Sequence, residues 1–521
     1  MLPQVPLELY VLEKGPEQDA GHDEAMLANS RQALSALAGA LHQCQETGQL
    51  SETWQAVYNY LLQQDKTDAG DADIQDILEL VRKALSAKYG DDKLPREIAQ
   101  ALFASGKSLR GSVTKLERYN NCPFQFYAQY GLRLKDRKIS SFSNPELGTL
   151  LHGVLKEFGE KLQAEGRHWS DVEPPEQKQM VHEIIGRLAP RLQNNILYSR
   201  QQLQVQLKRI ERTAAFALAR LCEFDKVSQL EPSYFEKSFG GSNTQKLNLV
   251  YQLTGGNRLE LSGQIDRIDM SEDGRYFIIM DYKTGTAAIN VVDVYYGLKL
   301  QLLTYTLVAM EMLAKERHQE SLPIGMLYYF LKKPVKSLGS HAEGKGDIVK
   351  ALEDELKMPG WIVADLELVQ LLDKDIMAKT NSRFIKASLK KDGTLSKQSS
   401  SLRTERELEM ILSYVGKLLE KTGNDILDGH IEPKPFKNKQ SMTCNYCSYR
   451  ALCGFDAQLA GFGYRSKDMK DEVCLAEIEA SLAPEELEQI DNKLTERNKA
   501  RAEAKEAEAK EKASKKQEVA E

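Results

Sequence analysis

Apolar side chains recur at helical spacing through the first hundred residues. The pattern covers residues 25–44, 52–63 and 73–87, and joints rich in Asp, Gly and Gln separate these segments. We therefore predict a helical N-terminal region over residues 1–105. Nothing in that region has the spacing of a catalytic or metal-binding motif.

Residues 112–230 contain the signals of further helices. Ser112 suits a helix N-cap, and Pro123 suits the first turn of a short second helix. An amphipathic pattern at 145–165 predicts a longer helix, with His152 just beside its apolar stripe. Gln-rich helical segments continue to about residue 230.

The period of the apolar positions then changes from helical to alternating. Three segments alternate at period two and are predicted strands: 247–253, 258–270 and 276–283. A turn at 271–274 separates the last two, and a helix at 294–315 and an apolar strand at 325–331 follow. The order predicts an α/β core of helix, three-strand meander, helix and strand.

The remainder of the chain is less regular. A polar loop occupies 332–350, and a helix is predicted near 404–419. From about residue 484 the chain is rich in Ala, Glu and Lys, which favours an exposed helix or disorder. We expect three parts: a helical region at 1–105, a catalytic domain at 106–460 and a charged tail at 461–521.

Two of the predicted strands bear the candidate chemistry. Alternation places Asp266 on the polar face of its strand, and it places Asp281 and Lys283 on one face of the next. A meander sets neighbouring strands about 5 Å apart. Asp266 and Asp281 can therefore reach one divalent cation, with Lys283 beside it.

This combination suits hydrolysis of phosphodiesters. A hard cation such as Mg²⁺ prefers oxygen ligands, neutralises charge on the phosphate and activates water, and a lysine can stabilise the same charge. Surface charges at strand ends are the simpler interpretation of the bare pattern. The apolar strand before Asp281 favours a metal, because a buried carboxylate needs a partner.

Three further residues fit this site. His152 could add a nitrogen ligand, although a single histidine can also be purely structural. Gln301 and Tyr305 are four residues apart on the predicted helix, share a face and could contact DNA or Lys283.

Four of the seven cysteines form a candidate cofactor site. Cys444, Cys447 and Cys453 are close together, and Cys122 lies more than three hundred residues earlier. Four thiolates suit either Zn²⁺ or a [4Fe–4S] cluster, and spacing alone leaves both open.

Composition narrows the class of protein. The chain has 521 residues, of which 41% are hydrophobic and 28% charged, with a net charge of −6. These values are typical of a globular protein and give no global nucleic-acid signature. No secretory signal or apolar span is visible, so we expect a cytoplasmic location and no membrane contact. An odd number of cysteines argues against a disulfide framework.

Four short motifs together resemble the PD-(D/E)xK nuclease superfamily, in its RecB-like branch. They occur in the family's order: Gly148-Thr-Leu-Leu-His152, Gly263-Gln-Ile-Asp266, Asp281-Tyr-Lys283 and Gln301-Leu-Leu-Thr-Tyr305. The resemblance implies that His152, Asp266 and Asp281 bind Mg²⁺ and that Lys283 is catalytic. It also implies that Gln301 and Tyr305 support the lysine.

A narrower resemblance covers about residues 105–460. The segment around Asn121-Cys122-Pro123-Phe124 and the terminal cysteines are similar to the AddB family, which belongs to the bacterial ATP-dependent helicase/deoxyribonucleases. This resemblance implies a [4Fe–4S] cluster on Cys122, Cys444, Cys447 and Cys453. The family's N-terminal helicase-like half is not seen in this sequence, so we expect a fragment, a split gene product or a reduced homologue.

The resemblance implies an exonuclease that acts in double-strand-break repair. It would cut the 5′-ended strand of DNA unwound by an AddA-type helicase/nuclease partner in a heterodimer. A free-standing RecB-like iron–sulfur exonuclease, an inactive nuclease fold that serves as a DNA-binding platform and a zinc-containing interaction protein are the alternatives.

Overall fold

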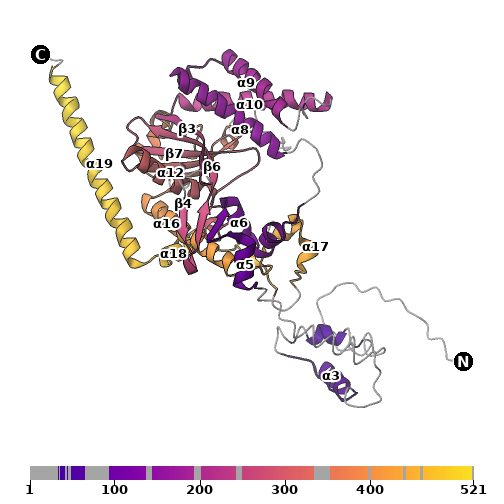
Figure 1. The fold of residues 1–521 in the computed structure, drawn as a ribbon. Helices are drawn as coiled ribbons and strands as arrows, with labels where there is room; N and C mark the ends of the chain where they lie inside the picture. Colours follow the sequence, from indigo (N-terminus) through magenta and orange to yellow (C-terminus); the bar gives the residue numbers. More distant parts are fainter. Residues whose placement is uncertain are drawn as a thin grey trace. The chain divides into compact units, whose positions relative to one another are not determined.

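A six-stranded mixed sheet forms the centre of the protein, in the strand order β10-β9-β8-β7-β6-β3 (Figure 1). β7 pairs with β8 and β9 with β10 in parallel, and the other neighbours are antiparallel. The six strands are β3 (Leu230–Phe239), β6 (Gly263–Ser271), β7 (Tyr276–Lys283), β8 (Leu322–Phe330), β9 (Gly360–Val363) and β10 (Leu402–Arg403).

The computed structural model describes most of the chain, with gaps. The described residues are 33, 36–41, 44, 49–64, 93–135, 144–192, 197, 201–241, 249–333, 352–396, 401–437, 442–457 and 462–518. The predicted helix at 73–87 lies outside them, as do most of the predicted helix at 25–44 and most of the predicted loop at 332–350.

The chain divides into two units. One contains residues 1–91 and 455–463, and the other contains 92–454 and 464–521. Within the first unit, α3 (Glu52–Gln64) confirms the predicted helix at 52–63, and its Trp54 packs with the buried Leu37.

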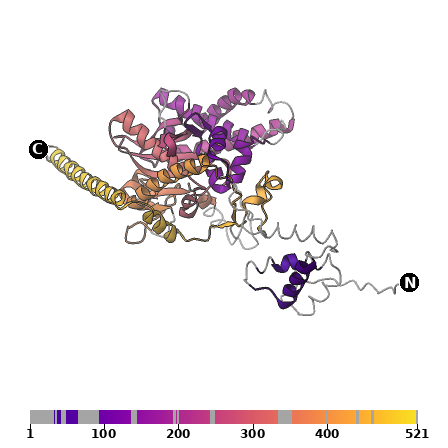
Figure 2. The same cartoon turned by 60° about the horizontal axis from the view of Figure 1, so that its bottom comes forward.

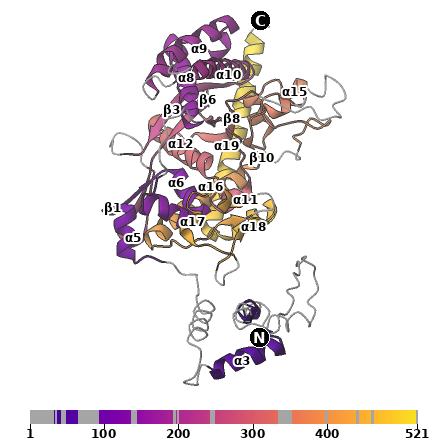
Figure 3. The same ribbon diagram turned by 90° about the vertical axis from the view of Figure 1, so that its right-hand side faces the viewer.

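Helices lie on both sides of the six-stranded sheet, and Figures 1 and 3 show this from two directions. α8 (Asn144–Glu165) packs against β3, and α9 (Pro174–Leu188) and α10 (Gln201–Asp225) lie beside α8. On the other side, α12 (Gln301–Arg317) packs against β7 and β8 and is covered by α16 (Glu405–Leu427).

A smaller four-stranded sheet combines two strands that precede β3 in the sequence with two strands that lie between β3 and β6. Its strands are β1 (Ala104–Ser105), β2 (Ser108–Gly111), β5 (Arg258–Leu261) and β4 (Leu249–Gln252), in that order. The prediction of one strand at 258–270 is therefore wrong. The chain leaves the small sheet at Ser262, whose N–H bonds to Gly111, and enters the large sheet at Gly263.

The predicted meander contains one wrong strand. Its first member is β3, and not the segment at 247–253, which belongs to the small sheet. β3 shows no clean alternation, because it contains Pro232 and a bulge between Pro232 and Tyr234. The order of helix, three strands, helix and strand is nevertheless present as α8, β3-β6-β7, α12 and β8.

Several predicted helix boundaries differ from the observed ones. The predicted helix at 294–315 is two helices, α11 (Val291–Tyr295) and α12, and Gly297 takes a positive φ of 72° between them. α16 begins after its N-cap Thr404 as predicted but continues to Leu427.

The C-terminal region is helical. α18 (Asp471–Ala480) and the first part of α19 (Pro484–Glu518) pack against α16 (Figure 2). Leu482 and Ile490 bury apolar surface against Met410, and Arg497 donates to Glu409.

A buried ion pair lies on the side of β6 opposite Asp266. Arg267 Nε and Nη2 donate to the two oxygens of Asp269 at 2.5 and 2.7 Å, and both side chains are almost fully buried. The guanidinium carbon lies 4.5 Å from the centre of the Trp169 ring. Two charges held in this way tolerate burial only as a pair.

Replacing Arg267 with methionine tests this pair. Because Asp269 would stay buried without its partner, we expect the free energy of unfolding to fall by about 3–5 kcal/mol. The double variant Arg267→Met/Asp269→Leu should lose less. Urea denaturation measures both, and Arg167→Met, which breaks the exposed pair with Glu176, should lower stability far less than Arg267→Met. Equal losses of stability in Arg267→Met and Arg167→Met would contradict this account.

Candidate active site

The register of β6 and β7 brings the two predicted aspartates to the same level. Arg267 and Met280 are the last paired residues where the β6–β7 ladder ends. Asp266 and Asp281 are the next residues along the two strands, so they lie opposite each other. Side chains at opposite positions of antiparallel strands project from the same face. Both aspartates are buried, Asp281 almost completely.

His152 and Asp266 meet a third residue, Glu236. Among the described residues, these three form a group whose potential ligand atoms all lie within 4.8 Å of one another. His152 Nδ1 lies 3.2 Å from Glu236 Oε1 and 3.3 Å from Asp266 Oδ1. The group combines one imidazole nitrogen with carboxylate oxygens, a donor set that can hold a divalent cation.

The backbone of Tyr282 positions two members of this group. Its N–H donates to Asp266 Oδ2 at 2.6 Å, and its carbonyl oxygen lies 3.2 Å from His152 Nε2. Burial lowers the pKa of His152, but hydrogen bonds to Asp266 and Glu236 outweigh burial and raise that pKa to about 10. The acidic surroundings therefore favour positive charge at this position.

Glu236 was not among the predicted site residues. It lies in β3, the strand that the alternation pattern missed, and its backbone has a positive φ of 48°. Such a conformation is costly for any residue except glycine. The available signal in the sequence was a glutamate among Tyr234, Phe235 and Phe239, residues that favour strands.

Asp281 and Lys283 form an ion pair at the end of β7. Burial, followed by the charge of Asp266, raises the pKa of Asp281 to about 7, although Lys283 opposes this shift. The raised pKa reports that Asp266 and Asp281 are electrostatic neighbours. A cation at this place would relieve their repulsion.

Gln301 and Tyr305 connect α12 to the lysine. Lys283 Nζ donates to Gln301 Oε1 at 2.9 Å, and Gln301 Nε2 donates to the Tyr305 hydroxyl at 3.1 Å. The lysine also lies 5.6 Å from the centre of the Tyr328 ring. These contacts restrict where the ammonium group can lie.

The four predicted cluster ligands all lie in the second unit, and none of the four forms a disulfide. Cys122 is buried between α6 (Val113–Asn121) and α7 (Pro123–Phe126), and the other three are partly buried around α17 (Arg450–Cys453). Burial raises the pKa of the Cys122 thiol to about 11, although the N–H groups of Gln125, Phe124 and Lys434 oppose this shift.

Hydrogen bonds tie the two cysteine-bearing segments together. Thr443 Oγ1 donates to Asn121 Oδ1 at 3.1 Å, so the residues that precede Cys444 and Cys122 are in direct contact. Arg465 Nη2 donates to the carbonyl oxygens of Asn120 and Asn121 at 2.6 and 3.0 Å. The donor set and this proximity fit a shared metal centre.

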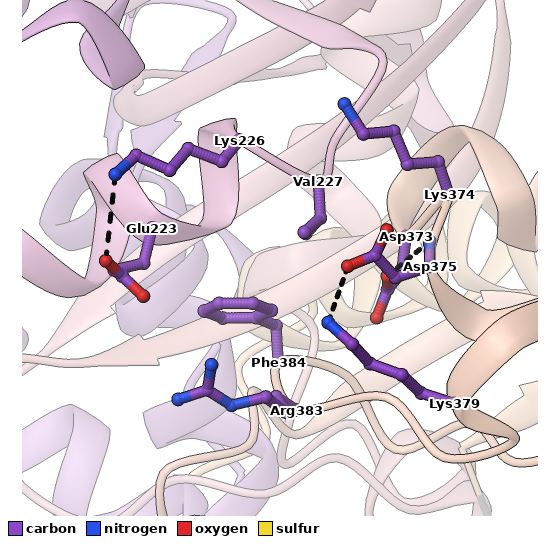
Figure 4. A pocket seen from close by; sticks show the side chains of 9 residues that line it. All are labelled: Glu223, Lys226, Val227, Asp373, Lys374, Asp375, Lys379, Arg383 and Phe384. Atoms are coloured by element: carbon purple, nitrogen blue, oxygen red, sulfur yellow. Dashed lines mark hydrogen bonds and ion pairs between the residues drawn. The ribbon is translucent and has the colours of Figure 1, made fainter.

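A separate pocket of about 290 Å³ lies between the end of α10 and the segment with α14 (Leu366–Leu372) and α15 (Ile376–Lys379) (Figure 4). Two ion pairs join residues that line this pocket: Lys226 with Glu223 at 3.9 Å, and Lys379 with Asp375 at 2.6 Å. It contains none of the residues predicted for catalysis.

No helix in the described part of the chain has the length and apolar character needed to cross a membrane.

Comparison with known proteins agrees with this geometry. Residues 110–454 match the PD-(D/E)XK nuclease superfamily, and the chain belongs to this superfamily. The predicted resemblance is thereby confirmed. Residues 19–70 match a second family, described as the fifth domain of the ATP-dependent helicase/deoxyribonuclease AddB.

Relatives named as the B subunit of an ATP-dependent helicase/deoxyribonuclease extend the similarity. The protein of Acetivibrio thermocellus is 31% identical over 476 residues, which are 91% of this chain and 40% of the relative. The protein of Bacillus subtilis is 30% identical over 471 residues, 89% of this chain and 39% of the relative. The chain thus spans about two fifths of the length of these relatives.

The raised pKa of Asp281 predicts how stability changes with pH. An acid whose pKa is raised binds its proton more tightly in the folded protein, so the free energy of unfolding falls as the pH rises from about 4 to about 7. In EDTA, Asp281→Asn should remove this loss and be more stable than wild type at pH 8, by at most about 4 kcal/mol. Thermal denaturation at pH 5 and pH 8 measures the difference.

A second acid provides the control. The pKa of Asp375 is lowered by a hydrogen bond from Lys379, so Asp375→Asn should bring no gain at pH 8. Saturating Mg²⁺ should stabilise wild type more than Asp281→Asn, because ligands stabilise the state that binds them. A constant difference between Asp281→Asn and wild type from pH 5 to pH 8 would show that Asp281 is not perturbed.

Proposed function

We propose that this chain is a Mg²⁺-dependent deoxyribonuclease that degrades single-stranded DNA from an end. The proposal depends on one observation, the convergence of Asp266, Asp281 and Lys283 at neighbouring ends of β6 and β7. His152 approaches the same place from α8. Carboxylates and an amine at one end of a sheet suit a reaction in which charge develops on a phosphate.

In this proposal His152, Asp266 and Asp281 hold Mg²⁺, and Glu236 adds a further oxygen ligand. The bound ion supplies charge neutralisation at the phosphate and lowers the pKa of a water molecule. Lys283 donates a hydrogen bond to the phosphate or to the attacking water, and Gln301 and Tyr305 hold the ammonium group in position.

The chain's own contacts support the assignment of roles. The backbone N–H of Tyr282 orients one oxygen of Asp266, and His152 contacts the other oxygen, so the sheet and α8 together set the position of this carboxylate. Lys283 is placed by contacts to Asp281 and Gln301 from two different elements. Groups held by rigid elements cost less reorganisation when substrate arrives.

We further propose that the chain acts with a motor partner. Its relatives are named as subunits of a helicase/deoxyribonuclease, and the segment matched here is about two fifths of their length. In this proposal an AddA-type helicase/nuclease subunit unwinds the duplex, and this chain cuts the 5′-ended strand during double-strand-break repair.

The four cysteines are proposed to hold a [4Fe–4S] cluster, with Zn²⁺ as the alternative. The contact between Thr443 and Asn121 supports a shared centre, because it brings the neighbours of Cys444 and Cys122 together. The cluster would fasten residues 112–131 to residues 434–456 and so close both ends of the nuclease domain.

Replacement of Lys283 by alanine tests the catalytic assignment. With Mg²⁺ and end-labelled single-stranded DNA, we expect the rate to fall by about 10²–10³-fold, because one charge-stabilising donor is lost. Affinity for DNA should change little. Lys357→Ala removes a lysine that pairs with Asp354 outside the site and should leave the rate unchanged.

The outcomes separate the competing functions. If wild type and Lys283→Ala are equally inactive in the presence of a motor partner, the chain is a DNA-binding platform. Full activity without any partner would favour a free-standing exonuclease. Labels at the 5′ and 3′ ends of the unwound strands report which strand is cut.

Replacement of Cys453 by alanine tests the cluster. Anaerobically purified wild type should contain about four iron atoms per chain, and Cys453→Ala should lose iron and become more sensitive to protease. Cys222→Ala alters a buried thiol in α10 and should keep its iron. A colourless wild type that contains one zinc ion would establish the alternative.

A further inference from the structure

α12 begins without a cap from its own sequence. The residue at its N-cap position is Leu300, which has no side chain that could accept a hydrogen bond. The first N–H groups of a helix have no partner within the helix and need an acceptor elsewhere. This end of α12 matters because its first residue is Gln301, which accepts the hydrogen bond from Lys283.

Glu117 of α6 supplies the missing acceptor. Its Oε1 accepts from the N–H of Leu300 at 2.6 Å and from the N–H of Gln301 at 3.1 Å. The two helices are almost two hundred residues apart in sequence, so this cap is a tertiary contact. A carboxylate at a helix N-terminus also interacts favourably with the helix dipole.

A second contact from α6 holds the loop just before α12. Asn120 Nδ2 donates to the carbonyl oxygen of Gly297 at 3.1 Å, and Thr422 Oγ1 of α16 donates to Asn120 Oδ1 at 3.1 Å. The approach is close, since a Cβ atom on Gly297 would lie 2.3 Å from Asn120 Nδ2. α6 therefore determines where α12 starts.

The surroundings of Glu117 are partly buried and electrostatically linked to the lysine. Burial raises the pKa of Glu117, and the N–H of Leu300, the charge of Lys299, the N–H of Gln301 and the charge of Lys283 oppose this shift. Glu117 thus contacts Gln301, the residue that binds Lys283, and the charge of Lys283 also stabilises the ionised form of Glu117.

We propose that Glu117 is a positioning residue for Lys283: it caps α12 and thereby fixes the Gln301 amide that holds the ammonium group. This inference deepens the proposed nuclease function and depends on it. Because α6 ends at Asn121, next to Cys122, and Asn121 contacts Thr443, the same helix connects the cysteine segments to the catalytic lysine. Glu117 is the last side chain in that path before α12.

Three variants of Glu117 test the inference. Glu117→Ala removes the acceptor, Glu117→Asp keeps the charge but is one methylene too short, and Glu117→Gln keeps the acceptor and the reach. We expect Glu117→Ala and Glu117→Asp to lower kcat at least 10-fold with KM for single-stranded DNA within about 3-fold of wild type. Glu117→Gln should keep kcat within about 5-fold, because the hydrogen bonds to α12 survive.

Asp365 offers a matched control. Its carboxylate also accepts two backbone N–H groups at a helix N-terminus, those of Glu367 and Leu368 at the start of α14. Asp365→Ala should lower the melting temperature and leave kcat unchanged. Hydrogen–deuterium exchange in the metal-free protein should become faster at residues 300–304 in Glu117→Ala and Glu117→Asp, and should stay slow in Glu117→Gln.

The outcomes are distinct. Faster exchange at residues 300–304 with an unchanged kcat would overturn the positioning role, as would an equal loss of kcat in Asp365→Ala or in Glu117→Gln. A wild-type chain that cuts no DNA contradicts the proposed function instead. Should Glu117→Ala fail to fold, the comparison of Glu117→Asp with Glu117→Gln decides the question.

Discussion

The pairing of β6 with β7 is the constraint on which the site depends. Their antiparallel register places Asp266 opposite Asp281, and the backbone N–H of Tyr282 holds the Asp266 carboxylate. The two acids are therefore brought together by sheet geometry and not by attraction, since their charges repel. Lys283 offsets this repulsion, and the proposed metal ion would offset it further.

Charged side chains are buried on both faces of β6 and β7, but they are compensated differently on each face. On one face Arg267 and Asp269 neutralise each other under the Trp169 ring. On the other face acids are in excess, and His152 and Lys283 are the nearby cations. The first face contributes an ion pair to the core, and the second face has an excess of negative charge that would favour the proposed metal ion. The same two strands thus serve stability and chemistry separately.

Much of the core could be predicted because its signals are local. β7 was predicted with its observed bounds, since an apolar run before Asp281 has one natural interpretation, and the spacing of Gln301 and Tyr305 placed both on one helix face. β3 was missed because a proline and a bulge break its pattern, and the division of 258–270 was missed because a single residue, Ser262, separates β5 from β6. Glu236 and Glu117 act through partners that are distant in sequence, and no local pattern encodes such contacts.

The backbone of Glu236 has a consequence for how this site could change. At a φ of 48° a glycine would sit without steric cost, but it would bring no oxygen to His152. The protein therefore accepts a local conformational penalty in return for one more negative group at its centre. Substitution of Glu236 by glycine should remove the backbone strain and also remove an oxygen ligand from the proposed metal site, which would be a trade-off between stability and activity.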